Sequence, residues 1–331
     1  MRRFAVKLLV LFAVVWGGWW YLATSSVHNR LNTWLEDRRA EGWQAEIASV
    51  TRAGFPLRIT TILTDISLVD PQTQGSLRVP ALTLSSPIYW PGHASVQLPA
   101  DPLVFTAAED TATLNWDGAN AAVRLHPGTA LQLETLSASS RNLSFELKDG
   151  QLISMANLQA DVAQARAPET YEIDLTATGL SFGPAFTGVL VRPAGTPDAF
   201  EPIIADMTVT FDRPWDRSAM QGTRPQPRMI RINELAANYS DTGMTASGEM
   251  SVDAEGVPTG ELRIKVRNWQ EIFELMVASN TIPPEWPPVA ERMLQSMSDL
   301  QGALDLTITA QSGQLRMGFL PLGPAPRLVI R

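Results

Sequence analysis

From residue 43 onward, apolar and polar residues alternate in one segment after another. The clearest apolar positions of this pattern are Leu143, Phe145 and Leu147; Ile173 and Leu175; Met207, Val209 and Phe211; Leu262, Ile264 and Val266; Leu304, Leu306 and Ile308; and Leu315, Met317 and Phe319. Successive side chains of a β-strand point to opposite faces, so such segments bury one face and expose the other. The chain is therefore expected to be mainly β.

Short turn signals separate these segments. They are Asp70-Pro71, Trp116-Asp117-Gly118, His126-Pro127-Gly128, Lys148-Asp149-Gly150, Asp241-Thr242-Gly243 and Ser312-Gly313. Parallel strands need helical crossovers, which this region lacks, so we predict long, twisted antiparallel sheets. The predicted inward-facing residues are Phe145, Val209, Ile264 and Ile308, and their neighbours on the other face are Glu146, Thr210, Lys265 and Thr307.

An apolar segment at residues 4–23 follows Arg2 and Arg3. At about 1.5 Å per helical residue, twenty residues span roughly the 30 Å hydrocarbon core of a bilayer. Arg2, Arg3 and Lys7 lie at its start and no further charge follows until Arg30, so the positive-inside bias leaves the N-terminus in the cytoplasm and exports the rest. We predict an N-terminal transmembrane helix within residues 1–25.

A cleaved signal peptide is the alternative interpretation of this segment. Ala23 and Ser25 are small enough to flank a cleavage site. The bulky run Trp19-Trp20-Tyr21 lies where signal peptides usually carry small residues, and it favours an uncleaved anchor. Both interpretations export the chain.

A short amphipathic helix is predicted within residues 26–42. Val27, Leu31, Trp34 and Leu35 recur at helical spacing, and Gly42 lies where a helix would end. Its apolar face is expected to cover one end of the sheet. The alternative is a helix that lies on lipid headgroups, which the acidic residues of this segment disfavour.

Two late helices are predicted near residues 268–279 and 289–300. Asn268 and Glu271 fit a capping box at the start of the first. The second follows a proline-rich break at residues 283–288. Its predicted apolar face consists of Val289, Met293, Met297 and Leu300.

The predicted domain organisation has two β-rich halves, residues 43–190 and 191–331. The boundary is placed in residues 191–202, which contain three prolines and Gly195. Whether the sheet is continuous across this segment is left open. A second irregular stretch at residues 212–228 contains four arginines and Trp215, which meet a partner or form a solvated loop between two strands.

Composition excludes several classes of function. The 331 residues include no cysteine, so disulfides, thiolate chemistry and a lipoprotein anchor are excluded. The net charge is -8 and the basic residues are scattered singly, which argues against nucleic acid as a partner.

Catalytic patterns are not found in the sequence. His28, His93 and His126 are widely separated and lack the spacing of metal ligands. The adjacent acids Glu36-Asp37 and Glu109-Asp110 point in different directions on a helix surface or in a loop. There is no nucleophile elbow, P-loop or dinucleotide fingerprint. We expect no enzyme activity and no catalytic, metal or cofactor residues, and we assign no contact residue for a lipid or a partner.

Several segments in order along the chain resemble a known family. They are Ala53-Gly54-Phe55-Pro56-Leu57-Arg58, the strand, turn and Pro-x-Gly return of residues 248–262, the helices from Asn268, and the last hairpin of residues 312–324. Together they resemble an uncharacterised alphaproteobacterial family of membrane-anchored periplasmic proteins, domain of unknown function 2125. That family is distantly similar to AsmA-like envelope proteins. AsmA-like proteins are several times longer, so a channel that spans two membranes is not implied.

The resemblance implies a non-enzymatic protein of the cell envelope, anchored in the inner membrane by residues 4–23 with the bulk of the chain in the periplasm. A twisted sheet with one apolar face can bind or transfer phospholipid or fatty acyl chains along that face. The alternative is a periplasmic scaffold or adaptor for envelope proteins, with a filled core and no ligand.

Overall fold

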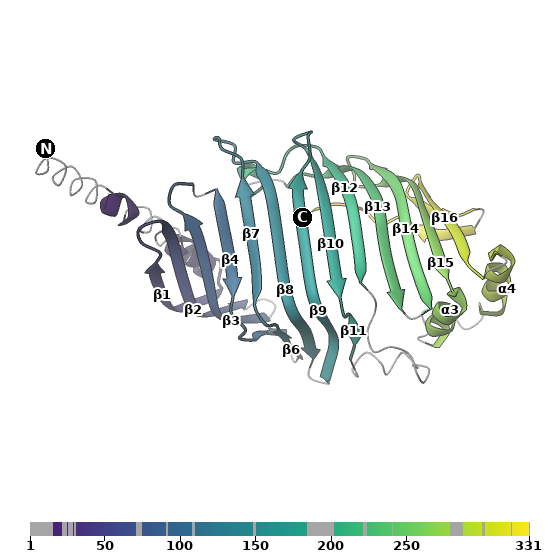
Figure 1. Cartoon of the computed structure of the whole chain (residues 1–331), viewed down its shortest axis with the longest axis horizontal. Helices are drawn as coiled ribbons and strands as arrows, with labels where there is room; N and C mark the ends of the chain where they lie inside the picture. Colours follow the sequence, from purple (N-terminus) through teal and green to yellow (C-terminus); the bar gives the residue numbers. More distant parts are fainter. Residues whose placement is uncertain are drawn as a thin grey trace, which may run out of the picture. The chain divides into compact units, whose positions relative to one another are not determined.

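The computed structural model describes most of the chain. The described residues are 16–21, 25, 29, 31–70, 75–90, 92–107, 110–147, 150–183, 202–220, 224–239, 241–278, 287–299, 302–318 and 320–330. The fold is mainly β, as the alternation predicts, and the registered strand pairs are antiparallel (Figure 1). The chain divides into two compact units: Met1–Arg124 with Phe145–Lys148, and Leu125–Ser144 with Asp149–Arg331.

The sheet of the first unit starts as a simple meander and then splits. Its strands are β1 (Gln44–Ala53), β2 (Arg58–Asp70), β3 (Gly75–Pro87), β4 (His93–Leu98), β5 (Leu103–Ala107), β6 (Asp110–Asn115) and β7 (Ala119–Leu125). β3 pairs at one end with β4 and at the other with β5. β7 then pairs with β4, and β6 with β5. Buried Trp116 lies at the split, where its Nε1 donates to the Pro99 carbonyl (2.7 Å).

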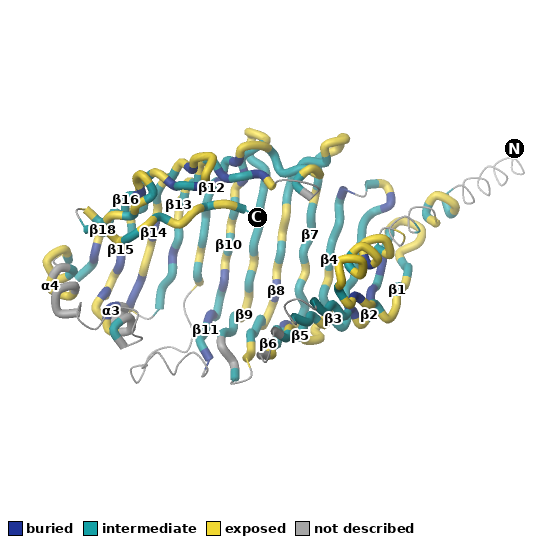
Figure 2. Tube along the Cα trace, turned by 180° about the vertical axis from the view of Figure 1, so that it is seen from behind, coloured by how far each residue is buried: buried dark blue, intermediate teal, exposed yellow. Residues whose placement is uncertain are grey.

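A helix of residues 31–40 lies over the sheet of the first unit (Figure 2). Leu35 is buried in this contact, as predicted, but Trp34 is 42% exposed, so its predicted place on the buried face is wrong. Gly42 ends the helix with a φ of 95°. The amides of Gly42 and Trp43 donate to the carbonyls of Arg39 and Arg38, the pattern of a Schellman motif.

The sheet of the second unit is a long meander. Its strands are β8 (Leu133–Leu147), β9 (Gly150–Gln164), β10 (Thr170–Thr178), β11 (Ser181–Phe182), β12 (Ile203–Phe211), β13 (Pro227–Tyr239), β14 (Thr242–Val252), β15 (Pro258–Arg267), β16 (Leu304–Gln311), β17 (Gln314–Met317) and β18 (Leu320–Pro324). β8 lies beside β9 in both views (Figures 1 and 2). From β9 to β18 each long strand pairs with the next, and β11 pairs with β9 as well.

The turn between β16 and β17 shows how the sequence sets this meander. Ser312 and Gly313 join β16 to β17 with φ values of 51° and 73°, and positive φ at both central residues is what a type I′ hairpin requires.

The domain boundary expected at residues 191–202 lies almost wholly outside the described residues. The flanking strands β10 and β12 are nevertheless paired, from Thr170↔Thr210 to Ala177↔Ile203. The sheet is therefore continuous across that boundary.

Helices α3 (Trp269–Ala278) and α4 (Pro287–Met297) form near the two predicted positions. α3 supplies Trp269 and Phe273 to a buried cluster with Val266 and Leu304 of the sheet, and Leu294 of α4 packs against it. Met297, predicted on the buried face of α4, is 39% exposed, so its predicted place on that face is wrong. The side chains of Val289 and Met293 and residue Leu300, predicted on the same face, lie outside the described part of the structure.

Two further expectations concern the start of α3 and the N-terminal anchor. Asn268, predicted to cap α3, has a φ of 51°, whereas an N-cap residue is usually extended. The predicted membrane anchor lies mainly outside the described residues. Its described part, residues 16–21, is helical. Within the described residues, no helix combines the length and the apolar character that a membrane crossing needs.

Candidate functional site: an apolar sheet face

One face of the second-unit sheet carries a continuous row of apolar residues. Directly opposed residues of neighbouring antiparallel strands lie on the same face. The registers place one such residue on each of eight strands, β9, β10 and β12 to β17: Val162, Ile173, Met207, Ile232, Gly248, Leu262, Ile308 and Met317. All eight are only partly buried. We call this set the apolar row.

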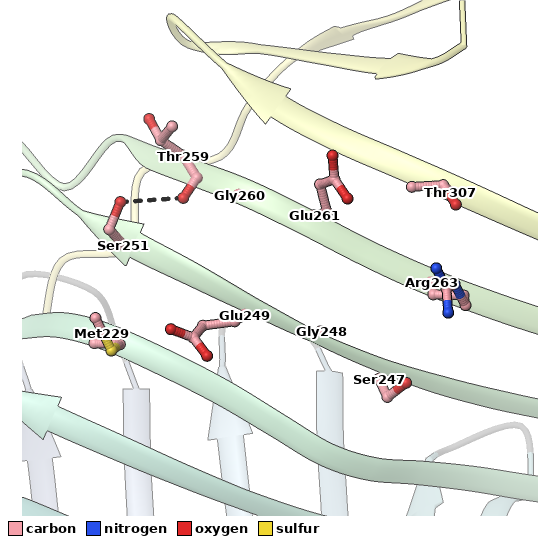
Figure 3. Close-up of a pocket in the computed structure, with 10 residues that line it drawn as sticks. All are labelled: Met229, Ser247, Gly248, Glu249, Ser251, Thr259, Gly260, Glu261, Arg263 and Thr307. Atoms are coloured by element: carbon pink, nitrogen blue, oxygen red, sulfur yellow. Dashed lines mark hydrogen bonds between the residues drawn. The ribbon is translucent and has the colours of Figure 1, made fainter.

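The opposite face of the same strands is polar and charged. Arg231 of β13 contacts Glu249 of β14, with both Nε and Nη2 at 2.9 Å from Oε2. A hollow of about 550 Å³ lies on this face. Figure 3 shows residues that line it, among them Glu249 of β14 and Glu261 and Arg263 of β15. The sheet is therefore amphipathic, as the alternation predicts.

Gly248 lies in the apolar row, and Gly260 lies beside the row on the same face, two residues before Leu262. A Cβ at Gly248 would lie 2.2 Å from the Glu261 carbonyl oxygen, and a Cβ at Gly260 would lie 2.2 Å from the Glu249 carbonyl oxygen. No side chain fits at either position without a backbone shift. The row thus has a bare stretch of backbone between Ile232 and Leu262, and glycine in a strand often marks a place where a ligand or another backbone approaches closely.

Packed clusters cover both ends of the apolar face. At one end lies the cluster under α3 and α4, with Val266 8% and Leu304 3% exposed. At the other end Tyr171, Val209 and Phe211 form a second buried cluster, against which Trp215 packs. Three residues of the apolar row, Val162, Ile173 and Met207, also pack against this cluster. The rings of Tyr171, Phe211 and Trp215 meet edge to face, with centroids 5.8 and 5.6 Å apart.

The phenol of Tyr171 ties this second cluster to the loop that follows β12. Its oxygen accepts hydrogen bonds from the Trp215 amide (3.0 Å) and from Nε2 of Gln164 (3.4 Å). Burial raises the pKa of Tyr171 above its ordinary value. Trp215, which the sequence left as a candidate partner contact, therefore serves the packing of this cluster.

The C-terminal segment, residues 325–330, crosses the sheet at this end (Figure 2). The Leu328 amide donates to the Gly256 carbonyl (2.8 Å). Gln226 binds the backbone of Ile330 twice, accepting from its amide (2.9 Å) and donating to its carbonyl (2.8 Å). Ile330 packs against the cluster of Tyr171. Sequence analysis missed this contact, because the segment carries no strand or helix pattern.

The predicted facing is confirmed for β12, β15 and β16. Val209 opposes Ile230, Ile264 opposes Leu306 and Lys265 opposes Asp305. The burial of these residues varies. Among those predicted to face inward, Val209 is buried, and Phe145, Ile264 and Ile308 are partly buried. Among their neighbours on the other face, Glu146 and Lys265 are exposed, and Thr210 and Thr307 are partly buried.

The histidines and paired acids are dispersed. His126 Nε2 lies 2.7 Å from Gln164 Oε1, and His93 starts β4. His28 and Glu109 lie outside the described residues. Glu36 and Asp37 are exposed on the helix of residues 31–40.

Comparison with known proteins gives one match. A family model described as an uncharacterized protein conserved in bacteria (DUF2125) matches residues 20–326. The search of curated proteins and the search of solved structures return no match. The matched range covers nearly all of the strands and helices described above, so the chain belongs to the DUF2125 family.

Proposed function

We propose that this protein is a non-enzymatic, membrane-anchored protein of the cell envelope that binds lipid along the apolar row. Three residues of the row, Val162, Ile173 and Met207, pack against the cluster of Tyr171. The observation that carries the proposal is the partial burial of the other five, from Ile232 to Met317, which belong to neither of the two clusters described above. These five residues form a surface that an acyl chain can cover.

The dimensions of the row suit an acyl chain. The five neighbouring strands from β13 to β17 span four spacings, about 19 Å at roughly 4.8 Å each. The tails of one lipid leaflet extend about 15 Å, half of a hydrocarbon core. Covering roughly 200 Å² of apolar surface would contribute about 5 kcal/mol at about 25 cal/mol per Å². Bare backbone at Gly248 lets a chain approach the sheet closely.

The anchor places this surface next to a lipid source. Residues 4–23 are apolar and follow Arg2 and Arg3, which favours a single-pass anchor in the inner membrane with the domain in the periplasm. A reporter that is active only in the periplasm, fused after Arg331, is expected to be active. Replacing Arg2, Arg3 and Lys7 by Glu should lower that activity. Cytoplasmic activity of the unmodified fusion would refute the localisation.

Two measurements on the full chain test lipid binding. Native mass spectrometry after gentle detergent extraction should show copurifying lipid masses. A photoreactive fatty acid should label the second-unit sheet. Ile308→Asp places a carboxylate in the apolar row and should abolish both signals, whereas Thr307→Asp, one position along β16 and on the polar face, should preserve them.

Circular dichroism and urea denaturation show whether each variant remains folded. A folded Ile308→Asp protein that keeps its lipid would place the ligand elsewhere. A bare unmodified chain with no labelling would refute lipid binding and leave the periplasmic scaffold as the function of the apolar face.

A further inference from the structure

The described part of the predicted anchor contacts the turn between β1 and β2. Trp16 Nε1 donates to the Pro56 carbonyl (2.9 Å), and Trp20 Nε1 donates to the Arg58 carbonyl (2.7 Å). The Trp20 ring meets Phe55 edge on, with centroids 5.5 Å apart. Two indole hydrogen bonds and one ring contact therefore hold this turn beside residues 16–21.

The turn between β3 and β4 lies at the same end of this sheet. The Ile88 amide donates to the Leu57 carbonyl (3.0 Å), and Ile88 itself is buried. Its neighbour Tyr89 is 74% exposed, and Phe55 and Leu57 are 60% and 62% exposed. We call Phe55, Leu57 and Tyr89 the apolar tip.

The charged side chains in the sequence around the apolar tip are basic. Residues 47–64 and 79–100, which form the two turns and their flanking strands, contain no Asp or Glu. Arg58 is exposed next to the tip, where its Nε donates to Ser85 Oγ (3.0 Å). Exposed aromatic and aliphatic side chains beside a cation suit the interface of an anionic bilayer, where aromatic rings sit at the headgroup level and basic side chains meet anionic lipids.

We propose that the apolar tip inserts into the interface of the membrane that holds residues 4–23. In the proposed anchor helix, Trp16 lies seven residues before Ala23, a distance of about 10 Å. The headgroup layer on each side of a bilayer is roughly 5–8 Å thick. The bond from Trp16 to Pro56 then places the turn near the boundary between headgroups and hydrocarbon. This inference rests on the proposed anchor and adds a second contact of the folded domain with the same bilayer.

The absence of cysteine makes the test direct, because one introduced cysteine is the only labelling site. Leu57→Cys and Tyr89→Cys place a polarity-sensitive fluorophore on the apolar tip. Gln44→Cys is the control, since Gln44 is exposed at the other end of β1, about 30 Å away at roughly 3.3 Å per residue. Each full chain is reconstituted into vesicles of phosphatidylcholine and phosphatidylglycerol.

The tip labels should show a shift of emission to shorter wavelength and a loss of intensity with lipids that carry a quencher near the headgroup. The Gln44 label should lose intensity only with aqueous iodide. Equal iodide quenching at all three positions, in a chain that remains in the vesicle membrane, would overturn the tip insertion and leave the anchor in place. Release of the chain into the soluble fraction would overturn both the anchor and the tip insertion.

Trp20→Phe provides a second measurement on a protein with an unaltered tip. It removes the indole donor to Arg58 while keeping a ring next to Phe55. The Leu57 label should then lose part of its emission shift, because the turn is held less firmly at the membrane. An unchanged emission shift would overturn the role of this bond in setting the depth of the tip.

Discussion

Substituting two leucines on the same sheet face tests whether the apolar row is a packed core or an open surface. Leu304 is 3% exposed and lies in the cluster with Val266, Trp269 and Phe273. Leu262 belongs to the apolar row and is partly buried. Both Leu→Ala changes delete the same atoms, so any difference in the free energy of unfolding reports what surrounds each side chain.

The expected costs differ by a few kcal/mol. Leu304→Ala leaves a closed cavity beneath α3 and should cost about 2 to 5 kcal/mol, the range for buried leucines. Leu262→Ala removes a side chain that already touches solvent and leaves no closed cavity. Its cost should be about 1 kcal/mol, part of the transfer free energy of a leucine side chain. Bound lipid should raise the cost of Leu262→Ala, because a ligand that binds only the folded state stabilises it in proportion to its affinity.

The assay is urea denaturation of the full chain in detergent, followed by hydrogen exchange of peptides from residues 242–311. Local exchange is needed because a chain with two compact units need not unfold in a single step. If Leu262→Ala costs as much as Leu304→Ala in delipidated protein, the apolar row is a packed core. That result would refute the partial burial on which the lipid proposal depends.

Two further predictions concern the packed end and the middle of the sheet. Tyr171→Phe removes the acceptor of the Trp215 amide and should cost about 1 to 3 kcal/mol by urea denaturation. Burial raises the pKa of Tyr171, so the phenol ionises at a lower pH in the unfolded chain than in the folded protein. The free energy of unfolding should therefore fall as the pH rises above about 10. This fall should be smaller in Tyr171→Phe. Gly248→Ala forces a Cβ against the Glu261 carbonyl and should cost about 1 to 3 kcal/mol, whereas Ser247→Ala, on the polar face of the same strand, should be nearly neutral in the same denaturation assay.

Local chemistry explains which parts of the fold can be predicted from the sequence. The alternation around Ile264 and Lys265 sets the face of each residue, and Ser312-Gly313 sets a hairpin, because both depend on neighbouring residues alone. The exposed side of α4 was predicted incorrectly because Met297 and Leu294 are both apolar, and only packing against Trp269 decides between them.

The candidate site depends on non-local geometry and is harder to predict. The apolar row requires the register of seven successive strand pairs, and the shifts between Asp206 and Met207 and between Ile232 and Leu235 change which residues oppose one another. The contact of Gln226 with Ile330 joins residues 104 positions apart. No local pattern indicates such a pairing.

The meander of the second unit makes this sheet modular. From β13 onward each described strand pairs only with its neighbours in the sequence, as repeats do in a solenoid. Removing or duplicating one hairpin would therefore change the length of the apolar row by two strands, about 10 Å, without altering the other pairings. Under the lipid-binding proposal, relatives with more or fewer hairpins would differ in the length of acyl chain that they accommodate, and the number of hairpins would set the size of the ligand.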